Sequence, residues 1–232
     1  MIMKIFSLEN DIIFSEECIN VLQIQDKKLF ANVINSLNDN INGIQNTKER
    51  IIILDNDTEI KMEKEALMVI DLFNIDFNQK KIQSALYNKI EKIYKQEFER
   101  MSEFQTLFQK LQLNVLDVFN EFPFEFNYKD SIGIQEYLKL LGLKISNNKG
   151  KIIDKIFSLI DAVEYLSVAK LLIFVNLKLY LSDDELNEIY KYAMYKKVNI
   201  LLIETGEEKE PIKNKKILFV DSDYDEIILY NK

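Results

Sequence analysis

The hydrophobic pattern of the first 54 residues predicts strands on either side of a helix. Residues 3–8 and 12–14 are short apolar runs separated by a polar turn, as in a β-hairpin. Residues 20–25 alternate between apolar and polar positions and predict a strand, after which Asp26 is placed to cap a helix that reaches about residue 40. Residues 50–54 (RIIIL) contain a continuous apolar run, which is typical of a strand buried on both faces. The N-terminal region therefore predicts an α/β fold.

The middle of the chain has a different pattern. From residue 63 to about residue 119 it has almost no Gly or Pro, and apolar residues recur at spacings of three and four. This spacing predicts helices, and a helical run of about 40 residues is longer than globular proteins usually contain. Residues 135–141 predict a short helix that ends at Gly142, and residues 153–168 predict another.

The strand pattern returns after residue 170. Residues 171–175, 199–204, 217–220 and 227–230 are short apolar runs. Ser182 and Glu185 form the sequence of a capping box that opens a helix. We therefore expect an α/β head domain with a mostly parallel sheet, interrupted by an inserted α-helical leg domain. The predicted boundaries are 1–64 and 155–232 for the head and 65–154 for the leg.

Composition limits the chemistry that the chain can perform. It has no histidine and a single cysteine, Cys18. A Ser/His/Asp or Cys/His nucleophile needs an imidazole base, and zinc sites favour His and Cys ligands. Carboxylates remain, and these suit a hard cation such as calcium. The lone cysteine indicates a reducing compartment. The first apolar stretch is too short for a signal peptide and no run spans a bilayer, so we expect a cytoplasmic protein.

Charge is sorted along the chain. The net charge is −8, which by itself argues against a nucleic-acid partner. Residues 139–155, however, hold five lysines and one acid, whereas residues 117–136 hold five acids and one lysine. The sequence also has no G-x-x-x-x-G-K-[ST] motif among its five glycines, so we expect no bound nucleotide.

Several segments, in a fixed order, resemble the Csn2 family of type II-A CRISPR-associated adaptation proteins. The resemblance covers nearly the whole chain and includes no catalytic motif. The segments that carry it are MKIFSLENDIIFSEECINVLQIQD, LMVIDLFNIDFNQKKI, EYLKLLGLKI, KIIDKIFSLIDAVEYLSVAKLLIFVNLKLYLSDDEL and NILLIE.

The resemblance implies a non-catalytic protein whose head resembles a degenerate P-loop ATPase. It implies a ring-shaped homotetramer that is supported by calcium and binds double-stranded DNA ends through a basic central hole. It further implies a role in spacer acquisition, with the CRISPR integrase (Cas-one and Cas-two) and the Cas-nine nuclease as partners.

Four acidic residues are the candidate calcium ligands, because calcium takes six to eight oxygen atoms. They are Glu121, Glu125, Asp130 and Glu136. From the residues alone, a solvated acidic loop is the favoured interpretation; the resemblance raises the calcium interpretation to equal weight. Asp221, Asp223 and Asp225 resemble the start of an EF-hand loop, but its Gly and final Glu are missing, so we expect a polar turn.

Lysines are the candidate DNA contacts, because phosphate neutralisation needs positive charge repeated along a face. The main set is Lys139, Lys144, Lys149 and Lys151, and the second set is Lys80, Lys81 and Lys89. The chain has only two arginines, Arg50 and Arg100, so it has few side chains suited to sequence-specific contacts with base edges. We therefore expect binding without sequence preference.

Three alternatives remain open at this point. The four acidic residues could hold two metal ions in a divergent nuclease, since carboxylates alone suffice for that. The helical segment could instead serve a pure protein-interaction module, and the phenylalanines between residues 98 and 126 suit packing or a subunit contact. An ATPase is disfavoured by the missing phosphate loop.

Overall fold

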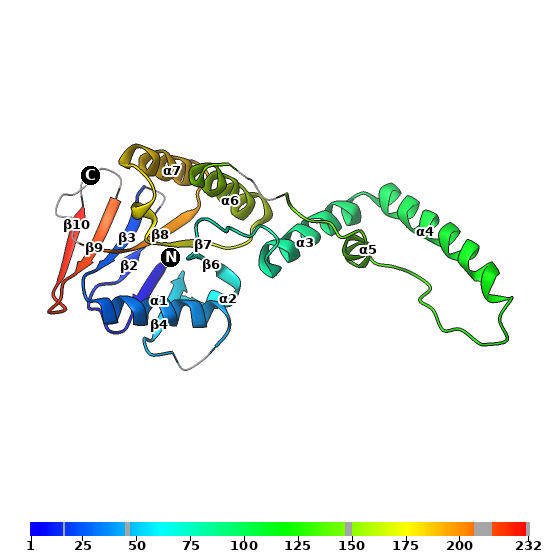
Figure 1. Cartoon of the computed structure of the whole chain (residues 1–232), viewed down its shortest axis with the longest axis horizontal. Helices are drawn as coiled ribbons and strands as arrows, with labels where there is room; N and C mark the ends of the chain where they lie inside the picture. Colours follow the sequence, from blue (N-terminus) through cyan, green and yellow to red (C-terminus); the bar gives the residue numbers. More distant parts are fainter. Residues whose placement is uncertain (16, 45–46, 147–149, 207–214, 231–232) are drawn as a thin grey trace. The chain divides into compact units, whose positions relative to one another are not determined.

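The chain folds into two compact units. The computed structural model describes residues 1–15, 17–44, 47–146, 150–206 and 215–230. The α/β unit is built from Met1–Asp76 and Asn147–Lys232, and the helical unit is Phe77–Ser146 (Figure 1). The predicted boundaries of the insertion, 65–154, extend beyond the helical unit at both ends. Residues 66–69 form a strand of the α/β unit, and residues 152–166 form a helix on its sheet.

A six-stranded sheet forms the centre of the α/β unit. Its strand order is β10-β9-β3-β8-β7-β6. All neighbours are parallel except β10 and β9, which are antiparallel. This confirms the prediction of an α/β fold with a mostly parallel sheet. The strands are β3 (Ile19–Ile24), β6 (Ala66–Val69), β7 (Leu171–Val175), β8 (Asn199–Thr205), β9 (Lys215–Val220) and β10 (Glu226–Tyr230).

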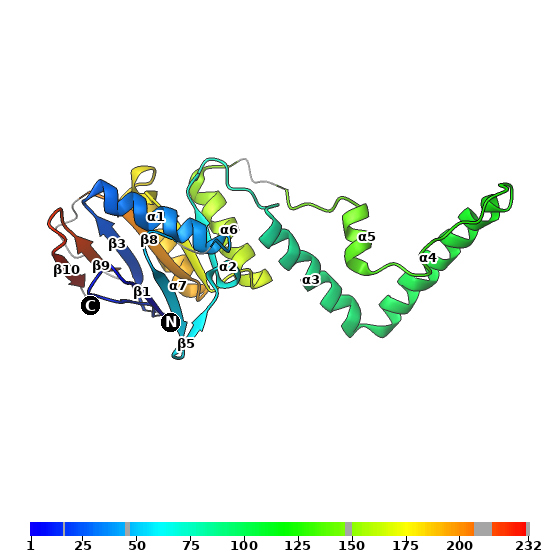
Figure 2. The ribbon, with the colours of Figure 1, turned by 90° about the horizontal axis from the view of Figure 1, so that it is seen from below.

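Different elements cover the two faces of this sheet. One face packs on α1 (Lys27–Ile41) and on a small antiparallel sheet of order β2-β1-β4-β5 (Figures 1 and 2). The other face is covered by α6 (Ile152–Leu166) and α7 (Asp183–Tyr195), with a short 3-10 turn, η1 (Leu177–Leu179), between β7 and α7. The small sheet contains β1 (Ile2–Ile5), β2 (Ile12–Ile13), β4 (Ile51–Asp55) and β5 (Thr58–Ile60), and a short helix, α2 (Met62–Glu65), follows it.

Several local predictions are confirmed. The Asp26 carboxylate accepts the Leu29 N–H at 2.7 Å and caps α1. At α7, Ser182 and Glu185 form the expected capping box. Gly142 has a φ of +65° just after α5 (Ile134–Leu140), a conformation that glycine adopts without strain. Cys18 is a free, buried cysteine.

Two predictions about buried strands and helices are wrong. The segment 50–54 was expected to be buried on both faces, but β4 lies in the small sheet with Ile51 and Ile53 turned to the core. The segment 63–119 was expected to be wholly helical, but β6 forms an edge of the large sheet with Ala66, Leu67 and Val69 buried. Four apolar residues fit either structure, and pairing with β7 decides between them.

The helical unit contains α3 (Lys80–Gln96), α4 (Phe98–Phe119) and α5. Glu97, with φ −111° and ψ 90°, separates α3 from α4 and so divides the predicted long helical run. A small apolar core joins α3 to α5 through Tyr87, Ile134 and Leu138. Among the described residues of the whole chain, no helix is long and apolar enough to cross a membrane.

Candidate nucleic-acid interface

The predicted lysines on α3 form part of a longer basic face. At about 100° per residue, Lys81, Lys89, Lys92 and Lys95 fall within an arc of about 120° and span about 21 Å along the axis. Lys80 lies outside this arc. We call these four lysines the α3 basic face. Lys92 and Lys95 were missed from the sequence, although their spacing of three from Lys89 and from each other could have indicated them.

Packing explains how the α3 basic face is presented. Ile82 and Tyr87 are buried on the apolar side of α3, which contacts α5. Lys92 and Lys95 are exposed, whereas Lys81 and Lys89 are partly buried at the border of the apolar side. Long aliphatic stems allow such lysines to keep the ammonium group in water. The face is nearly uniform in sign, because Glu91 is the single acid on α3 and it pairs with Lys95 at 2.9 Å.

The main predicted lysine set is divided between the two units. Lys139, in the last turn of α5, and Lys144 are exposed in the helical unit. Lys151 is the exposed N-cap residue of α6 in the α/β unit, where its N–H donates to Asp154 at 3.1 Å. Lys149 lies outside the described residues. The structure therefore does not bring this set together on one element.

Charge is segregated inside the helical unit. Helix α3 carries five lysines and one acid, whereas residues 97–130 carry seven acids and three basic residues. The helical unit as a whole has ten basic and nine acidic residues. It is thus nearly neutral overall although the whole chain has a net charge of −8. An anionic polymer would meet favourable charge on α3 rather than on α4.

The four predicted calcium ligands do not assemble into one site. Glu121, Glu125 and Asp130 are exposed on the segment after α4. The Glu136 carboxylate accepts hydrogen bonds from the Lys129 ammonium at 2.6 Å and from the Gly133 N–H at 3.1 Å. The bond from Lys129, followed by that from Gly133, lowers the pKa of Glu136 below its ordinary value.

No three His, Cys, Asp or Glu residues gather as a metal site anywhere in the described part of the chain. The candidate carboxylates therefore do not gather around a single position in the described part of the chain. The segment 221–225 is the polar turn that the sequence predicts: the Asp221 carboxylate accepts the N–H groups of Asp223 and Asp225 at 2.8 and 2.9 Å.

Helix α4 exposes much of its apolar surface. None of its 22 residues is buried, and Phe98, Leu111 and Leu113 are 84%, 63% and 63% exposed. A groove of about 510 Å³ between α4 and α5 is lined by Tyr94, Leu107 and other mostly apolar residues of the helical unit. Phe119, the last residue of α4, stacks on Phe126 with the two ring centroids 4.5 Å apart. Exposed apolar surface of this extent is typical of a protein-interaction site.

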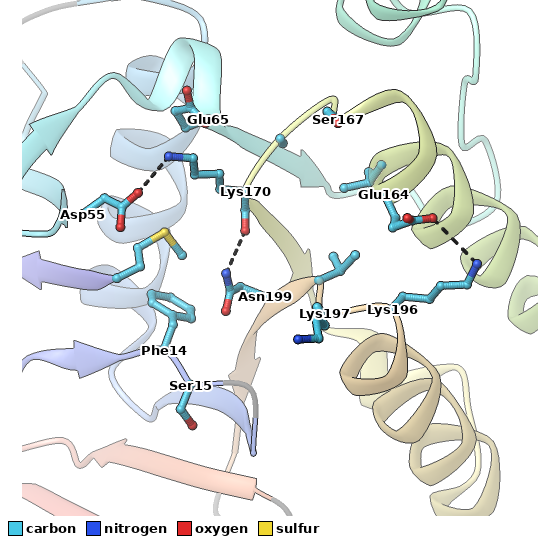
Figure 3. Close-up of a pocket in the computed structure, with 14 residues that line it drawn as sticks. Phe14, Ser15, Asp55, Glu65, Glu164, Ser167, Lys170, Lys196, Lys197 and Asn199 are labelled. Atoms are coloured by element: carbon cyan, nitrogen blue, oxygen red, sulfur yellow. Dashed lines mark hydrogen bonds and ion pairs between the residues drawn. The ribbon is translucent and has the colours of Figure 1, made fainter. Parts of the chain in front are cut away.

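A polar pocket of about 640 Å³ lies in the α/β unit at the amino ends of β7 and β8 (Figure 3). Lys170 points to Asp55 at 2.8 Å, and Lys196 bonds Asp161 at 2.8 Å and lies 3.7 Å from Glu164. The hydrogen bond with Asp55 raises the pKa of Lys170, and the same bond lowers the pKa of Asp55. Lys170 and Lys196 are therefore each paired with a carboxylate of the α/β unit.

Among solved structures, the chain is similar to a dimeric ATP-binding cassette protein in a post-hydrolysis state bound to ADP and phosphate. That similarity covers 100% of this chain and 97% of the other, with 9% identity and a TM-score of 0.39. Likeness at this level does not establish a shared fold.

Sequence comparison gives a firmer result. The family described as CRISPR-associated protein (Cas_Csn2) matches residues 43–224. A CRISPR-associated protein Csn2 of Streptococcus agalactiae is 24% identical over 190 residues, which cover 79% of this chain and 80% of that protein. One of Enterococcus faecalis is 29% identical over 144 residues, covering 60% of this chain and 64% of that protein. The chain therefore belongs to the Csn2 family of CRISPR-associated proteins.

Proposed function

We propose that this protein is a non-catalytic, sequence-independent binder of double-stranded DNA ends that acts in type II-A CRISPR spacer acquisition. It would work as a homotetrameric ring beside the CRISPR integrase and the Cas-nine nuclease. Family membership supports the CRISPR role. The observation that carries DNA binding is the α3 basic face, where four lysines share one side of a helix. Repeated positive charge of this kind neutralises phosphates without reading bases.

The start of α1 supports a role without nucleotide hydrolysis. In phosphate-binding α/β folds, a glycine-rich loop after a strand leads into a helix whose N-terminus binds the phosphate. Here only Gln25 and Asp26 connect β3 to α1, and the Asp26 carboxylate occupies the helix N-terminus. A carboxylate at that position repels phosphate. The nuclease alternative likewise gains no support, because the described carboxylates do not gather around a metal position.

Calcium enters the proposal through assembly. Because the described part of one chain does not gather the candidate ligands, calcium held by Glu121, Glu125, Asp130 or Glu136 would need oxygens from a second copy. Such an ion would stabilise the ring and thereby favour DNA binding.

A salt titration of binding to a short linear duplex tests the phosphate-contact claim. If the assembly makes six to ten phosphate contacts, affinity falls by about 10³ to 10⁵ between about 50 and 200 mM salt, because bound counterions are released. A flat response would remove phosphate neutralisation as the mechanism. The exposed apolar side of α4 favours a second candidate, a protein-interaction module, which predicts no DNA binding at any salt concentration.

A further inference from the structure

The outer edge of β10 has no strand partner among the described residues. β10 is the last strand of the large sheet and pairs only on its β9 side within the described residues (Figure 1). Edge strands usually carry Lys, Pro or a bulge that prevents another strand from pairing with them. Glu226 is the one charged residue of β10 and its carboxylate is bonded to the β1–β2 turn, whereas residues 227–230 contain no charged residue, no proline and no bulge. Ile227, Ile228 and Tyr230 are 49%, 46% and 41% exposed.

The register shows which backbone groups face outward. The Asp221 N–H donates to the Asp225 carbonyl at 3.1 Å, and these two residues continue the β9–β10 register. In an antiparallel pair, hydrogen-bonded and non-hydrogen-bonded residue pairs alternate. Ile227 and Leu229 therefore bond to β9, whereas the N–H and C=O groups of Glu226, Ile228 and Tyr230 point away from the sheet.

The beginning of β10 is held in place by the β1–β2 turn. The Glu226 carboxylate accepts the N–H groups of Glu9 and Asn10 at 2.6 and 2.9 Å. The Asn10 side chain donates a further hydrogen bond to the same carboxylate at 3.0 Å. β10 is therefore already ordered before a second strand pairs with it, so pairing costs little conformational entropy in β10.

We propose that β10 pairs antiparallel with β10 of a second copy, about a two-fold axis at Ile228. In this register Ile228 faces its own counterpart and Glu226 faces Tyr230 of the other copy. The outward N–H and C=O groups of Glu226, Ile228 and Tyr230 then all have partners in the second copy, and no like charges lie opposite one another. The pairing joins two six-stranded sheets through an isologous contact. It deepens the self-association in the proposed function and does not depend on DNA binding.

Cysteine cross-linking tests the register directly. In a Cys18→Ala background, which removes the one native cysteine, Ile228→Cys places two thiols opposite each other. Hydrogen-bonded antiparallel pairs have Cα atoms about 5.5 Å apart, within the range for a disulfide. Ile227→Cys is the matched control, because residue 227 would face residue 229 of the other copy, and its own counterpart lies about 7–8 Å away. Mild oxidation should give a covalent dimer much faster for Ile228→Cys.

A backbone variant tests the hydrogen bonds. Proline at residue 228 removes an N–H that β9 does not use, a position where an edge strand tolerates it, whereas Ile228→Thr keeps that N–H. Light scattering should show weaker self-association for Ile228→Pro than for Ile228→Thr, with circular dichroism confirming that both are folded. If Ile228→Pro does not fold, the comparison of Ile228→Cys with Ile227→Cys is the test of the proposal. Equal cross-linking of both cysteine variants, or a wild-type protein that stays monomeric, would overturn the proposal. Loss of DNA binding with this dimer intact would count against the proposed function alone.

Discussion

At the scale of single residues, Asp161 shows how the fold controls its ionisable groups. Its carboxylate on α6 accepts the Tyr192 hydroxyl at 2.6 Å and the Lys196 ammonium at 2.8 Å, joining α6 to α7. Burial alone would raise the pKa of Asp161. The hydrogen bonds from Lys196 and Tyr192 outweigh it, and the pKa lies below the ordinary value of 3.8.

This pKa direction gives a prediction about stability. Because the folded pKa is lowered, the contribution of Asp161 is present above pH 3.8 and is lost as pH falls through the folded pKa. The side chain is 48% exposed, so solvent screening keeps the contribution to about 1 kcal/mol or less. Asp161→Asn should lower the melting temperature at neutral pH, with the difference from wild type shrinking below about pH 4.

Glu188→Gln is the matched control, since it removes an exposed carboxylate from α7, the helix that carries Tyr192. It should leave the melting temperature nearly unchanged. A difference between Asp161→Asn and wild type that persists at low pH would mean that packing, and not ionisation, explains the effect.

Other residues show where sequence reasoning stops. Residues 20–25 include the polar residues Asn20 and Gln23, yet every residue of β3 is buried at the centre of the sheet. Buried polar residues are uncommon, so the pattern of residues 20–25 predicts the strand correctly but does not indicate that both of its faces are covered. No local sequence pattern predicts the ion pairs of the pocket in Figure 3, because Lys170 and Lys196 contact their carboxylates only through tertiary packing.

At the scale of elements, the basic face of α3 carries the functional proposal. Lys89→Gln with Lys92→Gln removes two charges and keeps good helix propensity. Each lost phosphate contact should reduce the salt slope of DNA binding by about 0.9, and affinity at low salt should fall accordingly. The slope of affinity against salt concentration is measured by fluorescence anisotropy. A change in this slope reports lost phosphate contacts, whereas a smaller amount of active protein would leave the slope unchanged.

Lys27→Gln with Lys28→Gln is the control, because it removes two exposed lysines from α1 in the α/β unit. This variant should keep the slope of the wild type. If the two double variants lose the same affinity, binding reflects net charge and the α3 basic face has no special part in it.

The elements that were predicted correctly share strong local signals. Asp26, the Ser182 capping box and Gly142 mark helix ends by chemistry that acts within four residues. The elements that were predicted wrongly have local sequence patterns that are compatible with two different structures. Residues 66–69 fit a helix or a strand, and residues 51–55 fit either sheet; long-range pairing with β7 and β1 selects the outcome.

At the scale of the whole molecule, the candidate calcium ligands remain a prediction. The sequence order of the acidic residues suggested one cluster, but the described part of one chain leaves Glu121, Glu125 and Asp130 apart and engages Glu136 with Lys129. Spacing along a loop does not fix distance in space, and ligands from a second chain are invisible to a single sequence.

Calcium removal tests whether the ion acts through assembly. If calcium stabilises the ring, a chelator should dissociate the tetramer and abolish DNA binding together. Light scattering and a binding assay on the same sample follow both properties. Loss of DNA binding from a tetramer that stays intact would show that calcium acts at the DNA contact.

If the protein is the proposed ring that binds DNA ends, the ring should pass over the end of a duplex. The most direct measurement compares binding to linear and closed-circular duplexes of equal length, with and without calcium. We predict binding to the linear duplex in calcium and little binding to the closed circle, because a closed circle has no end over which a ring can pass. Equal binding to both duplexes would contradict threading, and no binding to either would favour the protein-interaction module.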